Sequence, residues 1–141
     1  METKILSSTG FIHDFKTEEL YVLTRHWLSD IIFFGQEINY FQSLLTRYFK
    51  PNVEEDNLGH ILKLEAQLHD LDYRKDLLME QIILHQNKLG TLLDKLPSES
   101  DICHHDRHST LEGEIFEFMK VLRIAKLDFF NTTKFSGKPK R

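Results

Sequence analysis

The sequence has little of what marks a secreted protein, a membrane protein or a familiar enzyme. Its 141 residues include one cysteine, Cys103, which excludes an intrachain disulfide and a thiolate zinc cluster. No uncharged apolar run approaches the ~18 residues that a membrane span needs. The start METKILSSTGFIHDF lacks the apolar core of a secretion signal. These absences lead us to expect a cytoplasmic protein.

Catalytic and nucleotide-binding motifs are also missing, and neither charge sign dominates. We find no Walker-type glycine loop, Gly-x-Ser-x-Gly, CxxC, HExxH or basic-aromatic RNA motif, which lowers the odds of an enzyme. Lys and Arg number 18 against 22 Asp and Glu, a formal net charge of -4. This balance gives no electrostatic argument for binding nucleic acid or an anionic membrane surface.

Helix breakers are few, and where they fall divides the chain. There are only 6 Gly and 3 Pro, which leaves room for long helices. Pro51 and Pro97 lie in the polar stretches KPNVEEDN and KLPSESD, which read as loops. The sequence is therefore expected to form three segments.

Each segment carries apolar residues at alternating steps of four and three, the spacing of one face of a helix. The three stripes are Trp27, Ile31, Phe34, Ile38, Phe41, Leu45 and Tyr48; Ile61, Leu64, Leu68, Leu71, Leu78, Ile82, Leu89 and Leu92, interrupted by Lys75 and His85; and His108, Leu111, Ile115, Phe118, Leu122, Ala125 and Phe129. They predict helices over about 17–49, 57–93 and 104–132. The start of the third is open between Asp101 and a capping box of Ser109 with Glu112.

Long amphipathic helices joined by short loops favour antiparallel neighbours. We therefore predict an all-α fold, an elongated antiparallel three-helix bundle with coiled-coil-like packing. Residues 17–133 would form one domain, after an extension at 1–16 and before a disordered basic tail at 134–141. The first helix has an unusually broad apolar sector, because Phe33, Tyr40 and Leu44 widen it. That breadth indicates burial against two neighbours or a dimer mate.

Part of the pattern resembles a known group of proteins. His26-Trp27-Leu28-Ser29-Asp30 with Phe34, Glu37, Phe41 and Leu44-Leu45, then IILHQNKL around His85 and HSTLEGEIFEFMK around His108, is similar to a family of small bacterial long-helix proteins without an assigned function. The resemblance covers roughly residues 17 to 132. It implies a helical bundle or hairpin, and it brings no activity, cofactor or partner.

Histidine and carboxylate pairs recur at i and i+4, the spacing by which helical bundles present metal ligands. The pairs are His26 with Asp30, Glu65 with His69, and His108 with Glu112. Folding the chain about loop centres near 53 and between 98 and 99 places the pairs in separate layers. It also places position 85 opposite 112.

His85, His104, His108 and Glu112 are therefore the candidate metal ligands, and their types suit zinc, iron or copper. The simpler interpretation is that His85 and Glu112 form an ordinary hydrogen-bonded core pair, with HHDRH exposed.

Glu37 stands in the apolar sector of the first helix, where an unpaired carboxylate would cost several kcal/mol. The same folding scheme places position 37 opposite His69, with Lys126 about one turn away, and Tyr73 is a further donor. We predict that Glu37, His69 and Lys126 form a polar tie that sets the helix register. A general acid or base is one alternative, but it has no companion nucleophile. A Glu37 side chain that leans to the edge of the sector and is hydrated is the other. Trp27 and the aromatic row below it read as core rather than as a ligand-stacking surface.

These observations favour a non-enzymatic cytoplasmic protein that acts by binding another protein or itself, without a cofactor. The alternative is a metal-binding bundle, hemerythrin-like or an oxidoreductase, with zinc or iron at the histidine cluster. A third possibility is that the basic tail docks an acidic partner. No nucleic acid or membrane partner is expected.

Overall fold

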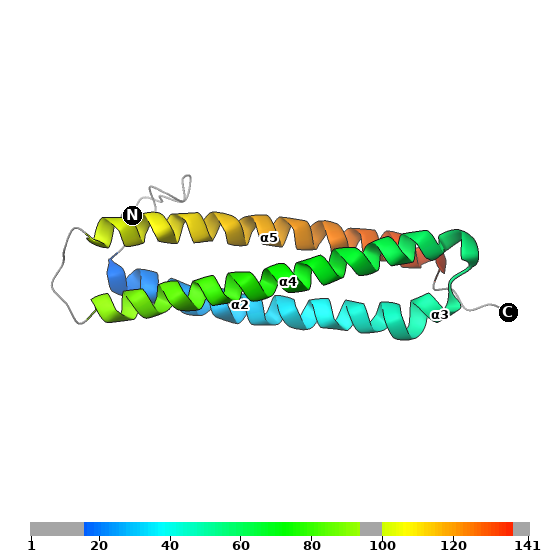
Figure 1. The fold of residues 1–141 in the computed structure, drawn as a ribbon, viewed down its shortest axis with the longest axis horizontal. Helices are drawn as coiled ribbons and strands as arrows, with labels where there is room; N and C mark the ends of the chain where they lie inside the picture. The colour runs from blue at the N-terminus through cyan, green and yellow to red at the C-terminus, as the bar shows by residue number, and fades with distance from the viewer. Residues whose placement is uncertain (1–15, 94–99, 137–141) are drawn as a thin grey trace, which may run out of the picture. The chain divides into compact units, whose positions relative to one another are not determined.

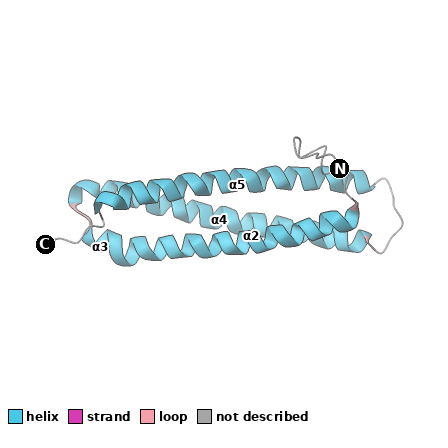
Figure 2. Cartoon of the chain, turned by 180° about the vertical axis from the view of Figure 1, so that it is seen from behind, coloured by secondary structure: helices cyan, strands magenta, loops and turns pink. Residues whose placement is uncertain are grey.

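The computed structural model describes residues 16–93 and 100–136, and no strand occurs among them (Figures 1 and 2). The elements in order are α2 (Thr17–Leu44), the π-helical turn η1 (Leu45–Phe49), α3 (Lys50–Asn52), α4 (Glu55–Leu92) and α5 (Ser100–Ser136). The predicted all-α, three-helix fold is confirmed, and its antiparallel, coiled-coil-like packing stays a prediction. Within the described ranges, no helix is long and apolar enough to cross a membrane.

Pro51 does not begin a loop as the sequence suggested, because the helical path continues through it. The Lys50 amide donates to the Leu45 carbonyl five residues back, and the Asn52 side-chain amide donates to the Tyr48 carbonyl at 2.6 Å. Pro51 occupies the first turn of α3, where its missing N–H costs little. Only Val53 and Glu54 separate α3 from α4, so the chain reverses at the predicted place over fewer residues than expected.

The third long helix extends past both of its predicted ends. It begins at Ser100, one residue before the alternative start at Asp101, so Ser109 lies well inside it and the alternative of a capping box at Ser109 is wrong. It continues beyond Thr132 because the Thr133 hydroxyl donates to the Phe129 carbonyl at 2.7 Å, as in a helix interior. Residues 134–136 of the predicted disordered tail are helical. The predictions for 1–15, 94–99 and 137–141 lie outside the described residues.

Contacts divide the described chain into two compact units, each with part of all three long helices. Unit 1 holds residues 16–32, 77–93 and 100–117, and unit 2 holds 33–76 and 118–136. The core of unit 1 comprises Leu20, Thr24, Trp27, Ile31, Leu78, Ile82, His85, Leu89, His108, Leu111 and Ile115. That of unit 2 comprises Ile38, Phe41, Leu45, Ile61, Leu64, Leu68, Leu71, Phe118, Leu122, Ala125, Phe129 and Thr133.

The buried residues follow the predicted stripes closely. Apart from Phe34 and Leu92, which are half-buried, and Tyr48, which is 43% exposed, the apolar stripe residues are buried. Tyr48 departs because it lies in η1, where the wider π-helical turn shifts the angular position of each residue. The stripes therefore identify most of the buried residues, and the only stripe residue that is exposed lies where the helix geometry changes.

The level of α4 against α2 is displaced from the predicted one by about one turn of helix. In unit 2, a Cβ on Gly35 would lie 3.2 Å from the Lys75 side chain, and Gln42 lines one pocket with His69. The sequence-based scheme had placed His69 opposite Glu37 instead. The chain enters this reversal through the π-helical turn η1 and through α3, two features that the sequence-based scheme did not include.

Candidate functional site

The most unusual core contact in unit 1 joins two histidine rings. His85 of α4 and His108 of α5 are 1% and 0% exposed, and His85 Nε2 lies 2.9 Å from His108 Nδ1. The Trp27 ring of α2 stacks on His108, with ring centroids 4.2 Å apart and an interplanar angle of 28°. Each of the three long helices thus contributes one ring to this cluster. We call the two imidazole rings the histidine pair, and the Trp27 indole packs against it.

Burial keeps both imidazoles neutral. Desolvation, and then the nearby side chains of His104, Arg107 and Lys88, lower the pKa of His85 to about 4. Desolvation, then His85 and His105, lowers the pKa of His108 to about 3. In a neutral pair, one inner nitrogen donates and the other accepts. The two outer nitrogens, His85 Nδ1 and His108 Nε2, are then one donor and one acceptor, both buried without a protein partner.

Of the four candidate metal ligands, the structure brings His85 and His108 into direct contact. The His104 ring centroid is 6.3 Å from that of His85, and Glu112 is half-buried one turn beyond His108 on α5. Across the described residues, no three or more His, Cys, Asp or Glu side chains are grouped so that they could hold a metal ion. The hydrogen bond in this layer joins His85 to His108 rather than to Glu112, and Trp27 was missing from the sequence-based site.

In unit 2, the carboxylate of Glu37 meets the ammonium group of Lys126. The Lys126 Nζ lies 3.2 and 3.3 Å from the two Glu37 carboxylate oxygens, and the side chains are 32% and 24% exposed. An ion pair this accessible to water contributes modestly to stability. His69, the third member of the predicted tie, is exposed on another surface of the unit.

Large apolar side chains flank this ion pair on both helices. Phe33 and Tyr40 share the helix face of Glu37, four residues before and three after it, and Met119 and Phe130 share the face of Lys126. Their exposed fractions are 56%, 62%, 39% and 56%. Phe130 lies on the α2 side of α5, because its ring centroid is 5.9 Å from that of Phe41. We call Phe33, Tyr40, Met119 and Phe130, with Glu37 and Lys126 between them, the aromatic face.

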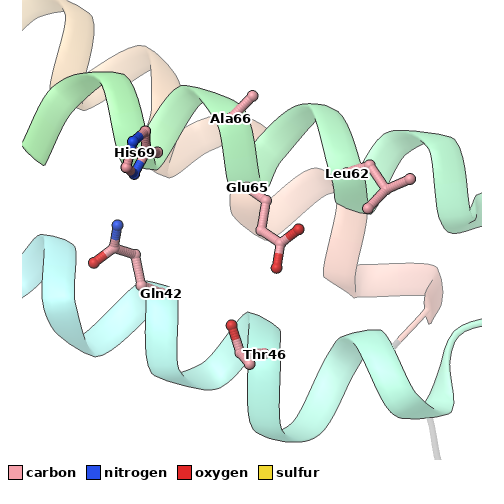
Figure 3. Close-up of a pocket in the computed structure, with 6 residues that line it drawn as sticks. All are labelled: Gln42, Thr46, Leu62, Glu65, Ala66 and His69. Atoms are coloured by element: carbon pink, nitrogen blue, oxygen red, sulfur yellow. The ribbon is translucent and has the colours of Figure 1, made fainter.

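A pocket lies on a different side of unit 2, where α2 and η1 meet α4 (Figure 3). It has a volume of about 490 Å³ and is lined by Gln42, Thr46, Leu62, Glu65, Ala66 and His69. In Figure 3 the His69 ring points toward the Gln42 amide, and the Glu65 carboxylate points toward α2. Lys50 Nζ lies 3.3 Å from both Glu65 oxygens, so an ion pair satisfies this carboxylate.

The three histidine and carboxylate pairs lie on different elements or surfaces. His26 and Asp30 are exposed on α2 in unit 1, whereas Glu65 and His69 line the pocket of unit 2. His108 of the third pair is in hydrogen-bond contact with His85.

Comparison with protein-family models, curated proteins and solved structures finds no match to this chain. The proposals below therefore depend on the geometry alone.

Proposed function

We propose that this chain is a non-enzymatic cytoplasmic protein that acts by binding another protein chain through the aromatic face. The observation that carries the proposal is the exposure of Phe33, Tyr40 and Phe130 on adjoining helix faces of unit 2. A fully exposed aromatic side chain offers on the order of 200 Å², so these three rings leave about 350 Å² of apolar surface in water. Contiguous apolar patches of this size commonly mark interaction sites.

The composition of the aromatic face also supports binding to protein. Interfaces are enriched in aromatic residues and Met, and they contain fewer charges at their centre than at their rim. The two charges inside this face neutralise each other at 3.2 Å, so a partner that covers them meets no unpaired charge. The pocket lined by Glu65 and His69 offers little apolar surface by comparison, and its carboxylate is already paired.

Site-specific photocrosslinking in the cells that make the protein tests this proposal. A photoreactive phenylalanine analogue is placed at Phe33, Tyr40 or Phe130, and the matched control carries it at Tyr73. Tyr73 belongs to α4 of the same unit and has the same exposed fraction as Tyr40, 62%. We expect protein adducts from the three face positions and little or none from Tyr73. Equal adducts at Tyr73, or none at any position, would refute the proposal.

A transition-metal protein is the second candidate function, and one observation favours it. The outer nitrogens of His85 and His108 are buried without a protein partner, which costs about 1–3 kcal/mol for each. A metal on one ring, with the other ring nitrogen held by its hydrogen bond, is a common arrangement for a histidine ligand. The donor set fits zinc poorly, since a structural site takes four ligands and only two imidazoles are in contact here.

Elemental analysis of protein purified without an affinity tag distinguishes the two candidates. A stoichiometric transition metal that disappears in His85→Ala, and is retained in the matched exposed-histidine variant His69→Ala, would establish the metal protein. Metal below one-tenth of the protein concentration in the wild type would rule it out and leave protein binding as the proposed function.

A further inference from the structure

The aromatic face is suited to a particular partner because its α2 side and its α5 side each carry two large apolar residues, with opposite charges between them. Along α2, Phe33 comes one turn before Glu37 and Tyr40 about one turn after it. Along α5, Met119 precedes Lys126 by two turns and Phe130 follows it by one. Each end therefore presents one exposed ring from α2 and one large apolar side chain from α5, and the ion pair occupies the centre.

We propose that a second copy of this chain covers the aromatic face and forms a twofold symmetric dimer; this inference rests on the proposed function. In a twofold interface the same patch is used by both subunits, so the patch must complement itself. Rotation about an axis that lies in the interface, parallel to the two helices and between Glu37 and Lys126, brings Phe33 of one copy near Met119 of the other and Tyr40 of one copy near Phe130 of the other. Ring–ring and Met–ring contacts are favourable there.

The charges at the centre are compatible with this rotation. Glu37 and Lys126 carry opposite signs and remain 24% and 32% exposed, so each retains capacity for a further contact. The twofold operation sets the acid and base of one copy against the base and acid of the other, and no like-charge contact is forced. A partner whose face carried charges of one sign only would place a like charge against either Glu37 or Lys126.

The area agrees with what a stable dimer needs. A standard interface buries roughly 800 Å² on each partner, of which somewhat more than half is apolar, about 450 Å². The three rings supply about 350 Å², and Met119, at 39% exposure, adds most of the remainder. Glu37, Lys126 and the exposed Arg123, three residues before Lys126, provide the polar part.

Sedimentation equilibrium of the purified full chain over a wide concentration range tests the dimer. We expect a reversible monomer–dimer equilibrium in the wild type. Phe130→Gln should weaken it about 100-fold, since the symmetric dimer loses two rings at roughly tenfold each. The matched control Tyr73→Gln should leave the dissociation constant unchanged. Circular dichroism of each variant checks that the helices remain folded.

Each other outcome overturns the inference in a defined way. A wild type that stays monomeric at all concentrations excludes the dimer. A dimer that Tyr73→Gln weakens and Phe130→Gln does not would place the interface elsewhere. The crosslinking experiment keeps the two proposals apart: if the chain is monomeric but adducts to a different protein form at Phe33 and Phe130, only the second copy is wrong. If no adduct forms, both proposals fail.

Discussion

At the scale of single residues, the His85–His108 contact makes the burial of each ring depend on the other. His85 Nε2 and His108 Nδ1 share a hydrogen bond at 2.9 Å, whereas His85 Nδ1 and His108 Nε2 are buried without a hydrogen-bond partner. Loss of one ring therefore leaves the other with both nitrogens buried and unsatisfied. Loss of both rings removes every polar atom of the pair from the core.

A double-mutant cycle follows from this dependence. His85→Leu should lower the free energy of unfolding by about 1–3 kcal/mol, because it strands His108 in the core. The double variant His85→Leu with His108→Leu should be closer to the wild type than the sum of the single variants, since both polar partners are gone. Urea unfolding of the four proteins measures this. Additive effects would mean that the 2.9 Å contact carries no coupling energy.

The lowered pKa values of the pair also predict how stability depends on pH. Well above pH 6.5 both rings are neutral in the folded and unfolded chain, so their contribution does not change there. Below 6.5 the unfolded chain takes up protons that the folded chain accepts only near pH 4 at His85 and near pH 3 at His108. The free energy of unfolding should thus fall by about 2 kcal/mol per histidine between pH 7 and pH 5.

Urea unfolding at pH 7 and pH 5 checks this value, and the double leucine variant is the control. The groups that further lower the two pKa values are Lys88 of α4 and the α5 residues His104, His105 and Arg107, which the variant retains. Its stability should therefore vary much less over this interval. An equal fall in the variant would assign the dependence to groups outside the pair.

At the scale of helices, two glycines separate intrinsic helix propensity from packing. Gly113 of α5 is exposed, and a Cβ there would meet nothing within 4 Å, so Gly113→Ala should stabilise the fold by about 0.5–1 kcal/mol. Gly35 of α2 is buried, and its Cβ would lie 3.2 Å from Lys75 Cε. Gly35→Ala should gain less, because Lys75 Nζ is held at 2.8 Å by Asp76 and 3.1 Å by Asp72. Thermal unfolding midpoints compare the two, and an equal gain would show that Lys75 moves freely.

The helices also show what could be read from the sequence and what could not. The steps of four and three identified Ile38, Leu68 and Leu122 as core because apolar periodicity alone decides which helix face is buried. The pairing level of α4 was displaced because it depends on the helix geometry that leads into the reversal, and apolar spacing does not predict a π-helical turn followed by Pro51 in a helical first turn.

The same displacement explains the outcome at the candidate sites. Lys126 reaches Glu37 because two long side chains tolerate an error of a turn, whereas His69 lies at the level of Gln42 and cannot reach. Trp27 was missed at the histidine pair because the predicted levels placed it away from His108, on which it stacks. The spacing of residues in the sequence therefore predicted the helix face on which each side chain lies. Which residue of a neighbouring helix it contacts depends on the actual level of the two helices.

At the scale of the whole molecule, the open question is whether units 1 and 2 unfold together. Helices α2, α4 and α5 each run without interruption from one unit to the other. Helix formation is cooperative along a continuous segment, so loss of structure in one unit removes support from three helices of the other. This continuity favours a single folding domain, as the sequence predicted for residues 17–133.

The single tryptophan provides a test, because Trp27 lies in unit 1 and reports on that unit alone. Phe129 is a core residue of unit 2, 2% exposed, and Phe129→Ala should cost about 3–5 kcal/mol. If the chain is one cooperative domain, this change lowers the urea midpoint of Trp27 fluorescence as much as that of circular dichroism at 222 nm, which follows all helices. The exposed-site control Phe130→Ala should move both midpoints only slightly at low protein concentration. A Trp27 midpoint that stays at its wild-type value while the circular dichroism transition splits would show two folding units joined by shared helices.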